Sequence, residues 1–235
     1  MMTTQLQILY EDNHMLGVLK RGGLLAQGDK TGDDTALAMA RRYVKDKYNK
    51  PGNVFIGLVH RIDRPVSGVM LFARTSKAAS RLASEFQARR VEKTYLAVVT
   101  GQVSDDGGEL VSWLERVRNK SRVVSGPSPD AKEAILTYRV LGRGRDSTLL
   151  ELRPATGRHH QIRVQLAEIG YPVVGDMKYG AGEPLPDKTI ALHAARIRVK
   201  HPTRDEMITV EAPPPQSQPW QPFRPTIGSY FETGE

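Results

Sequence analysis

An acidic residue between two arginines is the strongest chemical feature of the sequence. Asp63 lies in the segment HRIDRPVSG, residues 60–68, with Arg61 and Arg64 close on either side. The neighbouring cations favour an ionised carboxylate, which is the state that a nucleophile requires. A basic loop with a local salt bridge would contain the same residues, and from this segment alone that structural interpretation is favoured. Asp63 is therefore a candidate catalytic residue that needs support from the rest of the chain.

Motifs for several other kinds of chemistry are absent from the sequence. There is no cysteine, which excludes a thiolate nucleophile, a disulfide scaffold and a cysteine-based zinc site. The sequence has no G-x-G-x-x-G after a strand, no G-x-x-x-x-G-K-[ST], no H-E-x-x-H and no G-x-S-x-G. The adjacent His159 and His160 would point about 100° apart on a helix, so they do not form a metal-binding pair. We therefore expect no metal and no nucleotide cofactor.

Four blocks of sequence together resemble the RluA-type RNA pseudouridine synthases. HRIDRPVSG is similar to the family's H-R-[LI]-D-x-x-[TV]-S-G loop, and EKTYLAVVTG, residues 92–101, is similar to K-x-Y-x-A-x-V-x-G. Residues 152–180 resemble L-x-P-x-T-G-R-x-H-Q-I-R-x-H-L followed by G-x-P-[IV]-x-G-D-x-x-Y-G, and LHAARIRVKHP, residues 192–202, resembles L-H-A-x-x-[LI]-x-x-x-H-P. The blocks occur in family order between residues 60 and 202, and the resemblance runs over nearly the whole length of the chain. Val66, Gln165 and Arg21 depart from the usual family residues, which leaves the subfamily and its target uridine open.

The resemblance implies an enzyme that isomerises uridine to pseudouridine within ribosomal or transfer RNA, without a cofactor. It assigns the catalytic carboxylate to Asp63, acting on a base flipped out of the RNA. Either direct attack on ribose C1′ or proton abstraction at C2′ through a glycal is consistent with the sequence. The resemblance also pairs Arg163 with Asp63, and it places the ring of Tyr95 against the uracil, where the phenol could relay a proton. A surface ion pair for Arg163 and a buried strand position for Tyr95 are the structural alternatives.

Further residues are expected to contact the RNA. The resemblance implies that Arg61 fills the position vacated by the flipped base and that Leu192 forms an apolar wall of the pocket, although a core role for Leu192 is equally consistent. The remaining expected contacts from the matching blocks are His60, Arg64 and Arg158.

The charge of the chain also favours a polyanionic partner. Lys and Arg number 34 against 26 acidic residues, giving a net charge of +8 and a pI of about 9.7. In RVRNKSRV, an extended chain would place alternate cations on one face, where they could contact phosphates: Arg116, Arg118, Lys120 and Arg122. ARIRVK likewise sets Arg196, Arg198 and Lys200 opposite Ile197 and Val199. Each pattern is also typical of a solvated strand face.

Hydrophobic periodicity predicts an α+β fold with a mixed, mostly antiparallel sheet around an RNA-binding cleft. We expect hairpins over residues 5–20, 133–154 and 191–213, and strands over VMLFA and EKTYLAVVTG. Helices are expected from about Asp34 to the Pro51-Gly52 pair, across KAASRLASEFQARR after a Thr75 or Ser76 cap, and across RHHQIRVQLAEIG.

The organisation predicted from the sequence is one catalytic domain, residues 1–212, followed by a proline-rich extended tail, residues 213–235. The start of the chain has no leader pattern and coincides with the first hairpin of the catalytic domain, so we expect a cytoplasmic monomer without the S4 RNA-binding module of many family members. Two other functions fit the sequence less well. A non-catalytic RNA-binding module would not need Asp63, Tyr95 and Arg163 together, and a glycosidase would need two paired acids.

Overall fold

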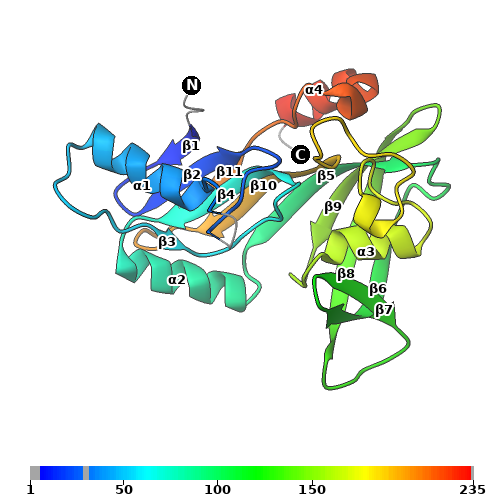
Figure 1. Ribbon diagram of the computed structural model, residues 1–235, viewed down its shortest axis with the longest axis horizontal. Coiled ribbons are helices and arrows are strands. Elements are labelled where there is room, and N and C mark those ends of the chain that lie inside the picture. Colours follow the sequence, from blue (N-terminus) through cyan, green and yellow to red (C-terminus); the bar gives the residue numbers. More distant parts are fainter. Residues whose placement is uncertain (1–5, 29–31, 234–235) are drawn as a thin grey trace. The chain divides into compact units, whose positions relative to one another are not determined.

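The computed structural model of the protein describes residues 6–28 and 32–233, and it divides into two compact units (Figure 1). The first unit comprises Met1–Glu92 and Ala194–Ala212, and the second comprises Lys93–His193 and Pro213–Glu235. Gln5, where the first strand was expected to begin, lies outside the described residues. Each unit has its own strands, helices and buried residues, and each is described by itself.

The first unit is a sheet with two helices (Figure 1). Its strands follow the order β1-β2-β4-β10-β11, and the short β3 pairs with β4. The pairs β1–β2, β2–β4, β3–β4 and β10–β11 are antiparallel. The elements are β1 (Gln7–Glu11), β2 (Met15–Lys20), α1 (Ala36–Lys47), β3 (Gly57–Leu58), β4 (Ser67–Ala73), α2 (Ser76–Gln87), β10 (Leu192–Lys200, from Ala194 in this unit) and β11 (Met207–Glu211).

Strand β4 forms the centre of the first unit. All seven of its residues are buried, as the apolar run VMLFA predicted for a strand covered on both faces. Val69 and Leu71 pack with Leu82 of α2 and Ile197 of β10 in one apolar cluster. Both helices begin at a threonine whose side-chain oxygen accepts a backbone N–H, and at α2 this residue is Thr75. The strand and the two capped ends thereby fix the loops that lead into and out of β4.

The second unit is an antiparallel sheet in the order β5-β9-β8-β6-β7. The helix α3 packs against β6, β7 and β8, and a small apolar cluster forms around Leu114, Ala134 and Val164. Its elements are β5 (Glu92–Thr100), β6 (Gly107–Val117), β7 (Lys120–Val124), β8 (Ala131–Arg143), β9 (Ser147–Pro154), α3 (Gln161–Glu168), η1 (Met177–Tyr179), η2 (Gln218–Phe223) and α4 (Arg224–Glu232).

Most of the predicted elements are confirmed, and the fold class is α+β as expected. The three hairpins, the three helices and the two strands occur at the predicted places, with ends that differ by a few residues. Gly170 takes a φ of +85° just after α3, as its predicted position beyond the helix end requires. Within the described ranges, no helix is long and apolar enough to span a lipid bilayer.

The prediction of an extended C-terminal tail is wrong. Residues 218–232 form the helices η2 and α4, and residues 213–235 group with the second unit. The prolines explain the difference, because η2 and α4 each carry a proline in their first turn, where its missing N–H has no intrahelical partner to lose. Trp220 and Phe223 are buried, so the segment contributes apolar contacts to its unit.

Gly68 provides a stability test of the first unit. A Cβ at this position would lie 2.4 Å from both the backbone nitrogen and the carbonyl oxygen of Ala194, and its φ of +130° suits only glycine. We predict that Gly68→Ala lowers the free energy of unfolding by about 3 kcal/mol or more, measured by urea denaturation. Gly28→Ala is the matched control, because no atom lies within 4 Å of the added methyl group. Equal stability of the two variants would contradict this close packing.

Candidate active site

The Asp63 loop is held at both of its ends. It joins β3 to β4, and the side chains of Ile62 and Val66 on either side of Asp63 are buried. Nε2 of His60 accepts a 2.8 Å hydrogen bond from the backbone N–H of Leu71, and the imidazole ring stacks on Phe86 with 4.6 Å between ring centroids. His60 therefore anchors the loop to β4. Asp63 itself is half-buried, which suits a carboxylate that must meet a substrate.

The buried amine of Lys20 ties the same loop to the end of β2. Its side chain is fully buried, and Nζ donates hydrogen bonds to the backbone oxygens of Arg21, Leu24 and Arg64 at 3.0, 2.8 and 3.2 Å. Burial lowers the pKa of Lys20 to about 7, although the nearby charge of Asp63 acts in the opposite direction. The Lys20 amine is thus hydrogen-bonded to the loop and interacts electrostatically with the Asp63 carboxylate.

Arg64 also holds the loop to the segment that follows β2. Its Nε donates to the backbone oxygen of Gly23 at 3.0 Å, its Nη2 pairs with Asp33 at 2.8 Å, and the N–H of Gly23 returns a hydrogen bond to the Arg64 carbonyl at 2.8 Å. Arg61 differs, because it is exposed and forms no hydrogen bond or ion pair with another residue in the described part of the chain. RNA contacts by His60, Arg61 and Arg64 stay predictions, but only Arg61 lacks a structural role within its unit.

In the second unit, Arg163 is fixed by an acidic residue that sequence reasoning missed. Arg163 lies on α3 and is buried, and Asp176 binds its Nε and Nη2 at 2.6 and 2.8 Å. The ring of Tyr179 lies 5.1 Å from the guanidinium carbon. A buried ion pair of this geometry is costly to break, so the guanidinium has one fixed orientation. Asp63 belongs to the other unit, and its pairing with Arg163 stays a prediction.

A polar network connects Tyr179 with the hairpin β6–β7. The hydroxyl of Tyr179 accepts the backbone N–H of Ser121 at 2.9 Å and lies 2.8 Å from Nδ1 of His160. The hydroxyl of Ser121 donates to the backbone oxygen of His159 at 2.6 Å. The two histidine rings stack with 3.8 Å between their centroids, so they support the start of α3. Among the described residues, no group of three or more His, Asp or Glu side chains is placed to hold a metal ion.

The other predicted site residues of the second unit, Tyr95, Leu192 and Arg158, differ in burial and in their contacts. Tyr95 is half-buried on β5 between the buried Thr94 and Leu96. Leu192 is 3% exposed, and Nε of Arg158 donates to the Glu133 carbonyl at 2.9 Å. These positions are compatible with the expected roles of Tyr95, Leu192 and Arg158, which stay predictions.

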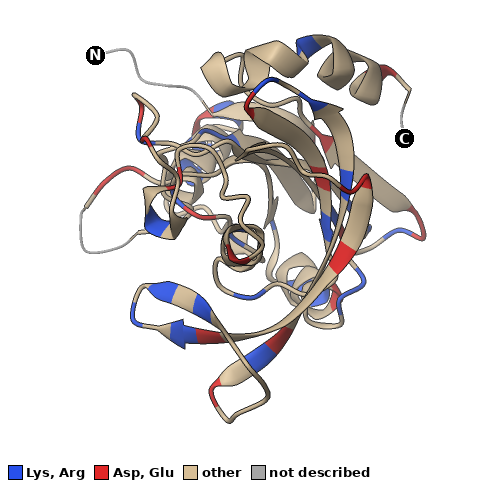
Figure 2. Ribbon diagram, turned by 90° about the vertical axis from the view of Figure 1, so that its right-hand side faces the viewer, with Lys and Arg blue, Asp and Glu red and all other residues tan. Residues whose placement is uncertain are grey.

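The prediction of a single cationic strand over residues 116–122 is wrong. The segment is the tip of the hairpin β6–β7, and Arg118 lies in the turn with a φ of 54°. Opposite residues in the register are Arg116 and Ser121, so the cations do not share one strand face. Arg122 is paired with Glu115 at 2.7 Å, whereas Arg116, Arg118 and Lys120 are exposed at the tip. Lys and Arg are drawn in blue in Figure 2. The hairpin therefore presents a compact cationic end.

The second cationic pattern has the predicted alternation. Ile197 and Val199 are 2% and 0% exposed, and the cations between them point away from the core. Acidic partners reduce the charge of this face: Arg196 pairs with Glu211, Arg198 with Glu92 and Lys200 with Asp205. Each cation of this face thus has an acidic partner that reduces its attraction for phosphates.

Comparison with known proteins identifies the family. The pattern of the family described as RNA pseudouridylate synthase matches residues 14–168, and the chain belongs to this family. It is 36% identical over 224 residues to the ribosomal large subunit pseudouridine synthase D of Xanthomonas campestris pv. campestris, covering 90% of this chain and 66% of that protein. It is 31% identical over 239 residues to the tRNA pseudouridine synthase C of Pectobacterium carotovorum subsp. carotovorum, covering 93% and 61%. The chain thus spans somewhat less than two thirds of the length of these relatives.

The fold is shared with solved structures of the same kind. The human RNA pseudouridylate synthase domain containing 4 superposes with a TM-score of 0.76, at 24% identity, over 89% of each chain. The predicted resemblance to the pseudouridine synthases is therefore confirmed in sequence and in fold.

Lys20 provides a test of the loop anchor. Lys20→Met should leave three buried carbonyls without their donor and lower the free energy of unfolding by about 2–4 kcal/mol near pH 6.

The pH dependence makes this test specific. Because the pKa is about 7 in the folded protein and about 10.4 in the unfolded chain, the unfolded state binds the extra proton between these values. The stability gap between wild type and Lys20→Met should therefore change across pH 7–10, with the wild type gaining by up to about 1.4 kcal/mol per pH unit. Urea denaturation at several pH values measures both curves. Parallel curves would contradict a neutralising, buried Lys20.

Proposed function

We propose that this chain isomerises uridine to pseudouridine within RNA, with Asp63 as the catalytic carboxylate. Two observations together support the proposal. The chain belongs to the family, and Asp63 lies on a loop that hydrogen bonds of Lys20 and Arg64 hold in place. Such a loop presents the carboxylate in a fixed place without burying it. Preorganisation of this kind is what a nucleophile needs, since misplacement by about 1 Å costs much of the rate.

The reaction needs no redox chemistry. The bond between uracil N1 and ribose C1′ breaks, the base rotates, and a bond forms between C5 and C1′. C5 then loses its proton and N1 gains one, so the composition of the RNA is unchanged. The Asp63 carboxylate either attacks C1′ and forms a transient ester, or removes the C2′ proton and gives a glycal. In both routes it must be ionised in the free enzyme.

Arg163 is proposed to orient Asp63 from the second unit. Asp176 binds the edge formed by Nε and Nη2, and the edge formed by Nη1 and Nη2 has the spacing to receive a second carboxylate. A guanidinium beside Asp63 would hold the carboxylate in one orientation. Tyr95 is proposed to stack on the flipped uracil and to take part in the proton transfer at C5.

The proposed substrate is structured RNA, of the ribosomal or the transfer class that the names of the relatives mention. The net charge of +8 supports a polyanionic partner, and the exposed cations of the β6–β7 tip can contact phosphates. Arg61 stands next to the catalytic residue with its guanidinium exposed, so it is proposed to occupy the gap left by the flipped base. A cytoplasmic location follows from this substrate and is part of the proposal.

Asp63→Asn tests the catalytic role. The change is nearly isosteric but removes the anion, so turnover should fall below about 1% of wild type while RNA affinity stays within a few-fold. Tritium release from C5-tritiated total RNA of cells lacking the gene measures turnover. Asp46→Asn, an exposed acid on α1, is the control and should be fully active. Substantial turnover by the Asp63 variant would exclude Asp63 as the nucleophile.

Arg61→Ala tests the flipping role. The variant should slow the reaction on a base-paired uridine by about tenfold or more, because the vacated position is no longer filled. A pre-unpaired uridine in the same sequence context should recover part of that rate, since unstacking then costs less. The comparison of single-turnover rates on the two RNAs is the measurement. Equal losses on both would mean that Arg61 supports the loop instead.

A further inference from the structure

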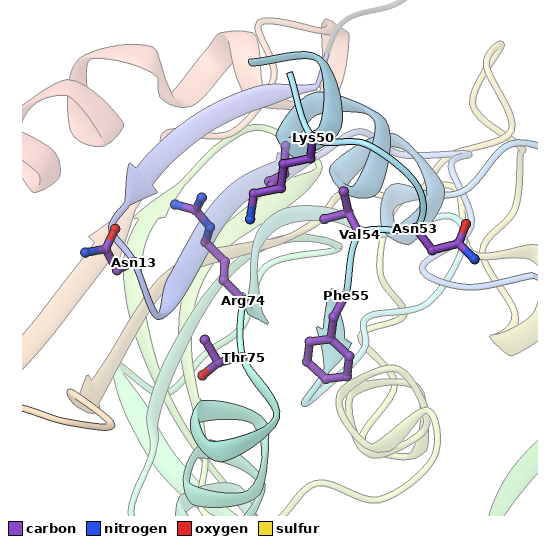
Figure 3. Close-up of a pocket in the computed structure, with 8 residues that line it drawn as sticks. Asn13, Lys50, Asn53, Val54, Phe55, Arg74 and Thr75 are labelled. Carbon is purple, nitrogen blue, oxygen red and sulfur yellow. The ribbon is translucent and has the colours of Figure 1, made fainter. Parts of the chain in front are cut away.

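A hollow in the first unit lies at the opposite end of the central strands from the Asp63 loop. Its volume is about 230 Å³, and it is bordered by the β1–β2 turn, the end of α1, the segment before β3 and the start of α2 (Figure 3). In the β2–β4 register, Lys20 lies opposite Gly68 and Met15 lies opposite Ala73. These five residue steps correspond to about 17 Å. The hollow is therefore separate from the catalytic loop.

Two cations point into this hollow. Figure 3 shows the side-chain ends of Lys50 and Arg74 directed toward one another. The Arg74 side chain is only 8% exposed. Its Nη1 donates to Glu11 at 3.1 Å and to the backbone oxygen of Asp12, whereas its Nε and Nη2 have no hydrogen-bond partner within the described ranges. A nearly buried guanidinium with unused donors is a binding group for an anion.

The local charge is not balanced within the protein. Glu11 is the carboxylate in contact with this group, and it is shared between Arg74 and Lys47, which lies 2.5 Å away. Tyr43 and Tyr48 also donate hydrogen bonds to Glu11. Lys50 is exposed and has no carboxylate partner in the described part of the chain. Arg74 and Lys47 share this one acid, and Lys50 adds a further cation to the lining of the hollow, which favours an anion such as a phosphate.

An aromatic ring borders the same hollow. Phe55 is 51% exposed and is one of the residues that line the hollow (Figure 3). Thr75 at another edge is the N-cap of α2, so the first backbone N–H groups of that helix, which have no intrahelical acceptor, begin here. Cations next to an exposed ring are the arrangement by which proteins bind single-stranded nucleic acid.

We propose that this hollow binds one nucleotide of the substrate RNA outside the modified position, with its phosphate between Lys50 and Arg74 and its base stacked on Phe55. The inference rests on the proposed function for the identity of the RNA, but not for the binding itself. The site would hold a single-stranded segment beside the target structure and would contribute affinity without taking part in the chemistry. Sequence tolerance is expected, because stacking and phosphate contacts do not read base edges.

Charge and stacking can be tested separately. The variants are Lys50→Gln and Phe55→Ala. The control is Lys45→Gln, because Lys45 is an exposed lysine of α1 that does not border the hollow. The probe is a fluorescently labelled uridine 20-mer, titrated at several salt concentrations. Lys50→Gln should weaken binding by about three- to tenfold, and its slope of log K against log salt should be shallower by about 0.7.

Phe55→Ala should weaken binding by about fivefold or more at every salt concentration without changing the slope, and Phe55→Trp should restore the affinity. The rate at saturating RNA should stay within twofold of wild type in all variants, which separates this site from Asp63. If the chain formed no pseudouridine but these binding changes occurred, the proposed function would fail and the nucleotide site would stand.

Three results would overturn the site. Lys50→Gln could change the affinity and its salt dependence no more than Lys45→Gln does, which would mean that Lys50 makes no specific contact with a phosphate. Phe55→Trp could bind as weakly as Phe55→Ala, which would exclude stacking. Finally, the variants could lose binding of free uridine monophosphate while their affinity for the 20-mer is unchanged, which would assign the hollow to a free nucleotide instead of RNA.

Discussion

The placement of Asp63 depends on the buried amine of Lys20. A lysine without solvent contact is unfavourable unless its donors are satisfied, and here three backbone oxygens satisfy them, one of them on the residue after Asp63. The turn after β2 and the Asp63 loop therefore cannot move apart without exposing an unpaired amine. Gly68 adds a second constraint, because its lack of a side chain lets β4 approach the backbone of Ala194. Together these contacts fix the loop and the strand that follows it.

In the second unit, a buried cation is likewise held in place by its hydrogen-bond acceptors, and here the cation is Arg163. The Arg163–Asp176 pair is buried, and such pairs contribute little net stability compared with apolar packing. Such a pair orients its side chains. The two hydrogen bonds to Asp176 and the contact with the Tyr179 ring hold the Arg163 guanidinium in one orientation. Tyr179 also bonds the hairpin whose tip carries the exposed cations. Tyr179 thus contacts both the arginine, through its ring, and the hairpin, through its hydroxyl.

Local signals predicted most of the fold. The Thr75 cap, Gly170 and the apolar runs act over a few residues, and each was read correctly from the sequence. The errors have physical reasons. Alternating cations are typical of a strand, but Arg118 adopts the left-handed conformation of a turn. A proline-rich segment was interpreted as extended, although a proline is also favourable in the first turn of a helix. Lys20 and Asp176 were missed because their importance arises from contacts between segments distant in sequence. The proposal of Asp63 as the catalytic residue came from the family resemblance, because the segment around it could not distinguish catalysis from a salt bridge.

A fixed Asp63 carboxylate that converts uridines of cellular RNA into pseudouridine can be tested directly in cells. The measurement is a map of pseudouridine across total RNA from cells with the gene, without it, and without it but carrying the wild-type or the Asp63→Asn chain. Defined sites in ribosomal or transfer RNA should lose pseudouridine on deletion, regain it with the wild-type chain and not regain it with the variant. An unchanged map after deletion, or full recovery with the variant, would contradict the proposed role of Asp63.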